Sequence, residues 1–267
     1  MKKKVIGGAL LGVSIIFLVL AVLEEYPYRK NERQMESLRT LAAAPAEEEN
    51  ADPYLERQID FKTLGEINQD IIGWISIPDT PVDYPILKNP ADDFYLYRDY
   101  AGNPNPAGSI FMRTSIPEDF SGRHTILYGH NMMDGQMFGS LPDFQAQESM
   151  ERHPHVYIYQ PEQVLRGRIY SAYTCMDATE TYRTEFGDQE DWEQWMRLTE
   201  TLGKSRIQAA DTDRILTLST CTADGKERFV VHCSLEDGKE AKDLVEGYSN
   251  TNDGMEASME GMGEKEW

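Results

Sequence analysis

Residues 59–236 alternate apolar and polar positions in short runs that are typical of β-strands. The clearest of these runs are residues 73–77, 156–159, 168–173, 215–219 and 229–235. Their β-branched and aromatic side chains favour strands, and proline or turn residues bound several of them. Few helical patterns lie between these runs. The chain is therefore predicted to be mainly β, with the strands forming a closed or nearly closed barrel that carries added helices.

Two segments have helical spacing. The first follows Asp60, which is a suitable N-cap, and places Phe61, Leu64 and Ile67 on one face. The second runs from Asp188 to Gly203, just before the last two strands. Its apolar face consists of Trp192, Trp195, Met196, Thr199 and Leu202. These patterns predict an N-terminal helical segment and a long helix ahead of the final hairpin.

The beginning of the chain predicts a single membrane anchor. Residues 5–23 carry no charge, and as a helix they would be about 28 Å long, close to the thickness of the bilayer core. No small-x-small cleavage site adjoins this run, so we expect it to be retained. Lys2, Lys3 and Lys4 favour a cytoplasmic N-terminus. The prediction is a single-pass protein of the cell membrane with everything after residue 24 outside the cell.

Composition divides the remainder of the chain. Residues 25–58 are polar and charged and predict an extracellular stalk. Residues 59–236 are predicted to form one folded domain, and residues 237–267 form an acidic tail that we expect to be disordered. A chain that begins near residue 50 is therefore expected to fold.

Charge and cysteine content exclude several functions. The sequence has 26 Lys and Arg against 46 Asp and Glu, a formal net charge of −20. This balance argues against a nucleic-acid partner, because phosphate binding needs a basic face. Three cysteines, none in a CxxC pair, do not indicate a disulfide framework or a zinc ribbon. No metal or other cofactor is predicted.

The three cysteines differ in context. Cys221 ends a strand in which Leu216 and Leu218 occupy one face, and it lies on the other, less apolar face beside a turn. It is either a reachable nucleophile or a buried small side chain. Cys233 aligns with the apolar positions of its own strand and is predicted to lie in the core. Cys175 ends another strand and is predicted to be structural.

Two further residues are candidates for the same site. Arg228 begins the strand after the turn that follows Cys221, so a hairpin would bring a cation near the thiol, where it could stabilise a thiolate or an oxyanion. His130 follows Gly129 at the end of a strand and precedes Asn131, which makes it the best candidate for proton transfer. The other histidines, which have weaker contexts, are His124, His153, His155 and His232.

These elements resemble a known family. The stretch Thr217-Leu218-Ser219-Thr220-Cys221, with Arg228 after it and a histidine upstream, resembles the sortase signature. The segment 128–139, which begins Tyr-Gly-His-Asn-Met, resembles the histidine region of class B sortases in particular. Residues 73–77 and 82–86 are similar to the opening strands of that class, and residues 188–203 to its extra helix.

The resemblance implies a sortase-like closed barrel and a cysteine transpeptidase. Cys221 would be the nucleophile, His130 the proton-transfer group and Arg228 the oxyanion donor. It further implies that Ser219, Thr220 and Asn131 contact substrate. The partners would be secreted proteins with a C-terminal sorting motif, an amine of a lipid-linked cell-wall precursor, and the membrane itself.

Several alternatives remain open from the sequence. One is a sortase that polymerises pilin-type subunits. Another is a different extracellular cysteine peptidase, such as a peptidoglycan hydrolase, although papain-like enzymes place cysteine before histidine and here His130 precedes Cys221. The last is an anchored wall protein without enzymatic activity, which has no need of a reactive thiol.

Overall fold

A closed β-barrel forms the centre of the molecule, as the strand pattern predicts. The computed structural model describes residues 29, 31–42, 52–176, 180–205 and 207–240. Within them the strand order around the barrel is β1-β2-β3-β4-β7-β8-β6-β5. The strands are β1 (Ile71–Ser76), β2 (Asp83–Lys88), β3 (Ile110–Met112), β4 (His124–Tyr128), β5 (His155–Tyr159), β6 (Gln163–Cys175), β7 (Ile215–Cys221) and β8 (Arg228–Glu240). The mainly-β fold class is thereby confirmed.

One pair of neighbouring strands determines where the site lies. β4 and β7 are parallel, with Tyr128 opposite Ser219. Because parallel strands end at the same edge, the loop after β4 and the turn after β7 meet at one end of the barrel. β8 returns antiparallel to β7, so that Arg228 lies opposite Cys221. Strands β4, β7 and β8 therefore bring the candidate residues to one edge.

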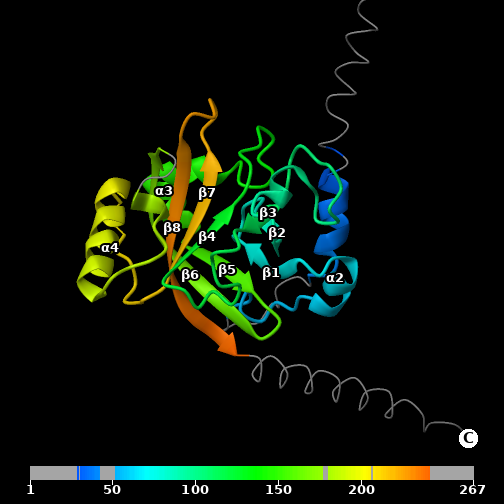
Figure 1. Ribbon diagram of the computed structural model, residues 1–267, viewed down its shortest axis with the longest axis horizontal. Helices are drawn as coiled ribbons and strands as arrows, with labels where there is room; N and C mark the ends of the chain where they lie inside the picture. The colour runs from blue at the N-terminus through cyan, green and yellow to red at the C-terminus, as the bar shows by residue number, and fades with distance from the viewer. Residues whose placement is uncertain (1–28, 30, 43–51, 177–179, 206, 241–267) are drawn as a thin grey trace, which may run out of the picture.

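Short helices surround the barrel. They are α2 (Phe61–Ile67), η1 (Phe94–Tyr97), η2 (Leu141–Gln145), α3 (Gln147–Arg152), η3 (Glu180–Tyr182) and α4 (Gln189–Gly203). Both predicted N-caps are confirmed, because Asp60 accepts a hydrogen bond from the Thr63 amide and Asp188 accepts one from the Asp191 amide, each at 2.9 Å. In Figure 1, α4 lies on one side of the barrel and α2 on the other.

The apolar faces of these helices are narrower than predicted. In α2, Leu64 is buried but Ile67 is 43% exposed. In α4, Trp192 and Trp195 are buried against the barrel, whereas Leu202 is 41% exposed. Only part of each predicted apolar face is therefore covered.

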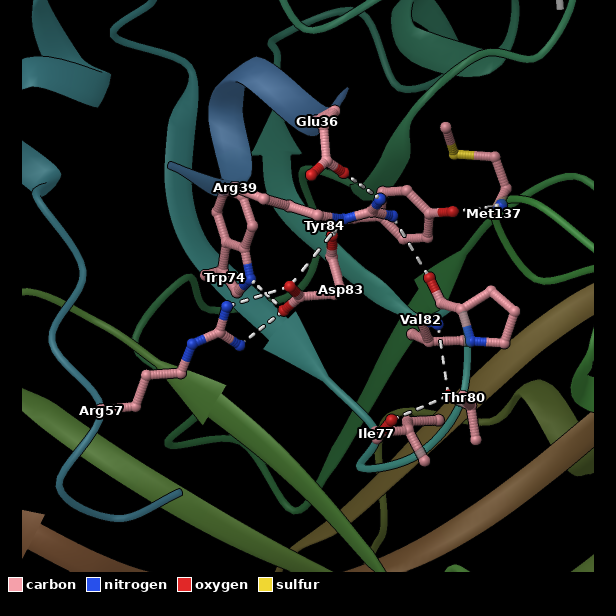
Figure 2. Close-up of polar contacts among 11 residues, drawn as sticks. Glu36, Arg39, Arg57, Trp74, Ile77, Thr80, Val82, Asp83, Tyr84 and Met137 are labelled. Carbon is pink, nitrogen blue, oxygen red and sulfur yellow. Dashed lines mark hydrogen bonds and ion pairs between the residues drawn. The ribbon is translucent and has the colours of Figure 1, made fainter. Parts of the chain in front are cut away.

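The segment predicted to be a stalk differs from that expectation. Residues 31–39 form a helix, here called the N-terminal helix, and its Met35 and Leu38 are each 2% exposed. Further along, Arg57 makes two hydrogen bonds to the Asp83 carboxylate, at 2.6 and 2.9 Å (Figure 2). The physical reason is a short apolar stripe, spaced three to four residues apart, that the charged composition of the segment obscures. These parts of residues 25–58 belong to the folded domain.

The two ends of the chain carry the remaining predictions. β8 continues to Glu240, past the predicted domain boundary at residue 236. The predicted membrane span at 5–23 and the tail beyond residue 240 lie outside the described residues. Within the described part of the chain, no helix combines the length and apolar character needed to cross a bilayer.

Candidate active site

Cys221 and Arg228 face each other across the hairpin of β7 and β8. The turn between them is closed by the Thr222 amide, which donates to the Glu227 carbonyl at 3.0 Å. Gly225 has a φ of +70° in this turn, a conformation that glycine adopts without strain. Arg228 Nη1 lies 3.3 Å from Cys221 Sγ. The predicted hairpin thus brings a guanidinium into hydrogen-bond contact with a partly exposed thiol.

The other two cysteines occupy different environments. Cys233 is fully buried, as predicted, and burial raises the pKa of its thiol well above its usual range. Cys175 is partly exposed at the end of β6 and lies opposite Arg228 on the side away from Cys221. None of the three cysteines forms a disulfide bond. Arg228 therefore has a thiol-bearing neighbour on each adjacent strand, and its Nη1 contacts the sulfur of Cys221.

His130 comes from the loop after β4, beside Cys221. The Gly129 amide donates to the Ser219 carbonyl at 3.1 Å, which extends the β4–β7 pairing one residue past the strand. Asn131 Nδ2 then donates to the Cys221 carbonyl at 2.8 Å. These two bonds flank His130 and tie its loop to the main chain of the candidate nucleophile.

The ring of His130 is oriented by a backbone carbonyl. Its Nε2 lies 2.6 Å from the Leu96 oxygen, and a carbonyl only accepts, so Nε2 carries a proton. In the neutral ring Nδ1 is then the basic atom. The exposed ring of Tyr97 lies alongside, with its centroid 5.2 Å from that of His130. Neither Leu96 nor Tyr97 was predicted to lie at the site. The Leu96 contact uses a main-chain carbonyl, which every residue type has.

Gly129 has a steric reason to be glycine. A Cβ at this position would lie 2.5 Å from Ile110 Cδ1 and 2.8 Å from a ring carbon of Phe138. Both contacts are closer than carbon atoms tolerate. The close approach expected from the sequence is therefore present, and it lets the His130 loop lie flat against β3.

The comparisons with known proteins identify the family. A model of the sortase domain matches residues 75–236, more than half of the chain. The chain belongs to the sortase family.

Its similar proteins are class B members. Sortase B of Listeria monocytogenes is 29% identical over 239 residues, which cover 84% of this chain and 96% of that protein. The structure of sortase B from Bacillus anthracis in complex with AAEK1 is 32% identical with a TM-score of 0.68, covering 79% of this chain and 99% of that one. The Staphylococcus aureus sortase B-substrate complex is 30% identical with a TM-score of 0.63, covering 66% and 84%. The protein is a sortase B-type cysteine transpeptidase.

Two of the three residues predicted to bind substrate are buried within this sortase. Ser219 and Thr220 are each 2% exposed. The Ser219 hydroxyl lies 2.7 Å from the Tyr182 hydroxyl, and the Tyr182 ring stacks at 6.4 Å on Tyr128. Tyr128 in turn stacks on Phe111 at 5.5 Å. This row of three aromatic rings beside the cysteine strand was not predicted, because its members come from three separate elements.

Two buried histidines, His124 and His232, lie under α4. His124 Nδ1 lies 2.7 Å from the Arg183 carbonyl, and its Nε2 lies 2.6 Å from the Thr217 hydroxyl. That hydroxyl lies 2.8 Å from His232 Nδ1, whose Nε2 lies 3.0 Å from the Tyr173 hydroxyl. Both rings are buried, which lowers the pKa of His124 to about 4 and holds that of His232 well below its ordinary value. These rings stay neutral and structural.

The remaining histidines do not form a metal site. His153 lies 3.0 Å from the Pro78 carbonyl, and His155 begins β5. Across the residues that the structure describes, no group of three or more His, Cys, Asp or Glu side chains has an arrangement that could hold a metal ion.

Proposed function

We propose that this sortase cleaves a C-terminal sorting motif of secreted proteins and transfers them to an amine of the cell wall. In the first half-reaction the Cys221 thiolate attacks a backbone carbonyl of the motif. A carbon–sulfur bond forms, the carbon–nitrogen bond breaks, and the departing amine takes a proton from His130. The observation that carries the proposal is the contact of Arg228 Nη1 with Cys221 Sγ at 3.3 Å.

The second half-reaction reverses the roles. An amine on a lipid-linked wall precursor attacks the thioacyl carbonyl while His130 takes its proton. The new carbon–nitrogen bond replaces the carbon–sulfur bond, and the thiolate is released. The anchoring of His130 Nε2 on the Leu96 carbonyl supports this role, because it leaves Nδ1 as the atom that exchanges the proton.

Arg228 is proposed to stabilise the negative charges that the reaction requires. A guanidinium beside the sulfur favours the thiolate, and it can stabilise the negative oxygen that develops on the attacked carbonyl. The β7–β8 pairing fixes the two residues opposite each other, so little reorganisation is needed when that charge forms. The side-chain amide of Asn131 donates a hydrogen bond to the Cys221 carbonyl. We propose that the other hydrogen-bonding groups of this side chain face the peptide substrate.

The predicted anchor fits the same function. Residues 5–23 would hold the enzyme at the outer face of the membrane, with a cytoplasmic N-terminus following the positive-inside rule. Both the sorted protein and a lipid-linked amine reside there, so tethering raises the effective concentration of each reactant.

The test uses a library of peptides with candidate sorting motifs, with and without glycine-based or wall-derived amines, read by mass spectrometry. The wild-type enzyme should convert peptide to an amide when amine is present. Cys221→Ala should lose all product, while the matched variants Cys175→Ala and Cys233→Ala should retain it. Activity in Cys221→Ala would refute the nucleophile. If only free acid forms across the whole amine panel, the better description is an extracellular cysteine peptidase.

A further inference from the structure

The N-terminal helix carries one polar side chain that is completely buried. Asn31 is 0% exposed, although it lies near the beginning of a helix whose neighbours are mostly charged. Burying an amide is unfavourable unless its donors and acceptors are satisfied. The partners of Asn31 therefore show what this end of the helix is built to hold.

Asn31 bridges two loops that are far apart in sequence. Its Nδ2 donates to Gln136 Oε1 at 2.9 Å, and its Oδ1 accepts from Asn105 Nδ2 at 2.7 Å. Gln136 belongs to the loop that begins with His130. Asn105 donates its backbone amide to the Tyr97 carbonyl at 2.9 Å. One side chain thus joins the loop of His130 to the segment that follows η1.

Each of these loops holds one part of His130. The main chain of His130 is fixed in its loop by the Phe138 amide, which donates to the His130 carbonyl at 3.0 Å. The ring is fixed by the Leu96 carbonyl, next to Tyr97. The separation of these two loops therefore determines how the ring sits relative to its own backbone, and Asn31 spans that separation.

A second connection runs from the same helix to the same loop (Figure 2). Arg39 Nε donates to the Asp83 carbonyl at 3.3 Å, and its guanidinium lies 5.2 Å from the centre of the Tyr84 ring. The Tyr84 hydroxyl accepts from the Met137 amide at 3.1 Å. Met137 has a φ of +52°, a strained value that the surrounding contacts must hold. The helix thus supports the His130 loop at two points.

We propose that Asn31 is a positioning residue for His130, and that the N-terminal helix is a working part of the active site. The inference rests on the proposed function, since it takes His130 as the proton-transfer group. Proton transfer requires heavy atoms within about 3 Å, so a small displacement of the ring slows both half-reactions. Loss of Asn31 would let the two loops separate while leaving Cys221 and Arg228 paired on their strands.

The principal variant is Asn31→Leu, which keeps the size and removes both hydrogen bonds. We expect kcat to fall by about 10-fold or more while KM stays close to the wild-type value, because misplacement costs rate more than ground-state binding. The ring signals of His130 in NMR spectra, assigned with His130→Ala, should shift and broaden. Ser37→Ala, at an exposed position on the same helix, should leave kcat and the His130 signals unchanged.

Two further variants separate positioning from stability. Val164 is buried at the end of β6 that lies away from Cys175 and Arg228. Val164→Ala removes buried volume there, so it should lower the melting temperature without changing kcat. Gln136→Met breaks the same contact from the loop side and should reproduce the loss of Asn31→Leu. The double variant Asn31→Leu/Gln136→Met should be no slower than Asn31→Leu alone, since the leucine has already removed the hydrogen bond that Gln136 accepts.

The failures can be told apart. If His130→Ala keeps full activity, the proposed function of His130 is wrong. If His130→Ala is inactive while Asn31→Leu and Gln136→Met both have wild-type kcat and unchanged His130 signals, only the positioning role is overturned. A multiplicative loss in the double variant would also overturn it, because it would mean that the two residues act independently.

Discussion

The buried pair His124 and His232 should make this sortase unstable in mild acid. The Arg183 carbonyl only accepts, so His124 Nδ1 donates to it and His124 Nε2 accepts from the Thr217 hydroxyl. That hydroxyl must then accept from His232 Nδ1, and His232 Nε2 accepts from Tyr173. Every proton in the chain is assigned by this order. Protonating either ring places a donor against a donor, in a site without solvent.

The sign and size follow from linkage. The pKa of His124 is about 4 in the folded protein, below its ordinary value of about 6.5, because burial disfavours the charged ring. The unfolded chain therefore binds the proton first, and stability is lost as pH falls below about 6.5, the unfolded value. Between about pH 7 and pH 5 the loss from His124 is about 2 kcal/mol, and the lowered pKa of His232 adds a loss of the same sign.

The assay is the free energy of unfolding in urea, measured at a series of pH values between about 5 and 7. This window lies above the range in which carboxylates with lowered pKa values titrate, such as that of Asp60, which is held low by the Thr63 backbone and side chain. His232→Gln should reduce the steepness of the pH dependence, because one titrating group is removed.

Equal slopes in the wild type and His232→Gln would refute this reasoning. So would NMR titration of the folded protein in which the His124 and His232 rings gain protons near pH 6.5, since buried rings in a complete hydrogen-bond chain should not.

Two other predictions concern the site directly. Arg228→Ala should lower kcat for peptide cleavage by about 10²-fold, the usual scale for an oxyanion donor. Arg228→Lys should retain only part of the wild-type kcat, because lysine lacks the planar guanidinium fork. A wild-type rate in the alanine variant would contradict the role of Arg228. Gly129→Ala should reduce both melting temperature and activity, because its Cβ would collide with Ile110 and Phe138, whereas Gly65→Ala in α2, with open space around it, should raise stability by about 0.5–1 kcal/mol. A Gly129→Ala enzyme with normal activity would show that the loop moves aside freely.

The parts of the site that sequence reasoning found are the ones set by local geometry. Cys221 and Arg228 are neighbours because a short turn joins their two strands. Such a hairpin can be predicted from strand alternation and turn residues in the sequence. His130 was found through its flanking Gly129 and through family resemblance. Its ring partner was not found, because the Leu96 carbonyl belongs to the main chain and any residue type supplies one.

Alternation along β7 was read correctly but does not reveal what covers each face. Thr217 and Ser219 share the less apolar face, yet both are at most 2% exposed. α4 lies over this side of the barrel, and its Trp195 contacts His124 at a ring separation of 4.5 Å. The polar residues of this strand face therefore belong to a buried hydrogen-bond network and are not exposed. The sequence of the strand does not reveal this, because the covering helix comes from a separate part of the chain.

The N-terminal segment shows why composition misleads at a domain boundary. Net charge and polarity average over all side chains, whereas docking of a short helix needs only one stripe, and here Met35 and Leu38 supply it. Because Asn31 then reaches the two loops that hold His130, a chain beginning near residue 50 would lack part of the support of its own site. The hydrophobic stripe packs the helix against the barrel domain, and the buried Asn31 amide connects it to two loops. The folded unit of this sortase accordingly begins upstream of the first barrel strand.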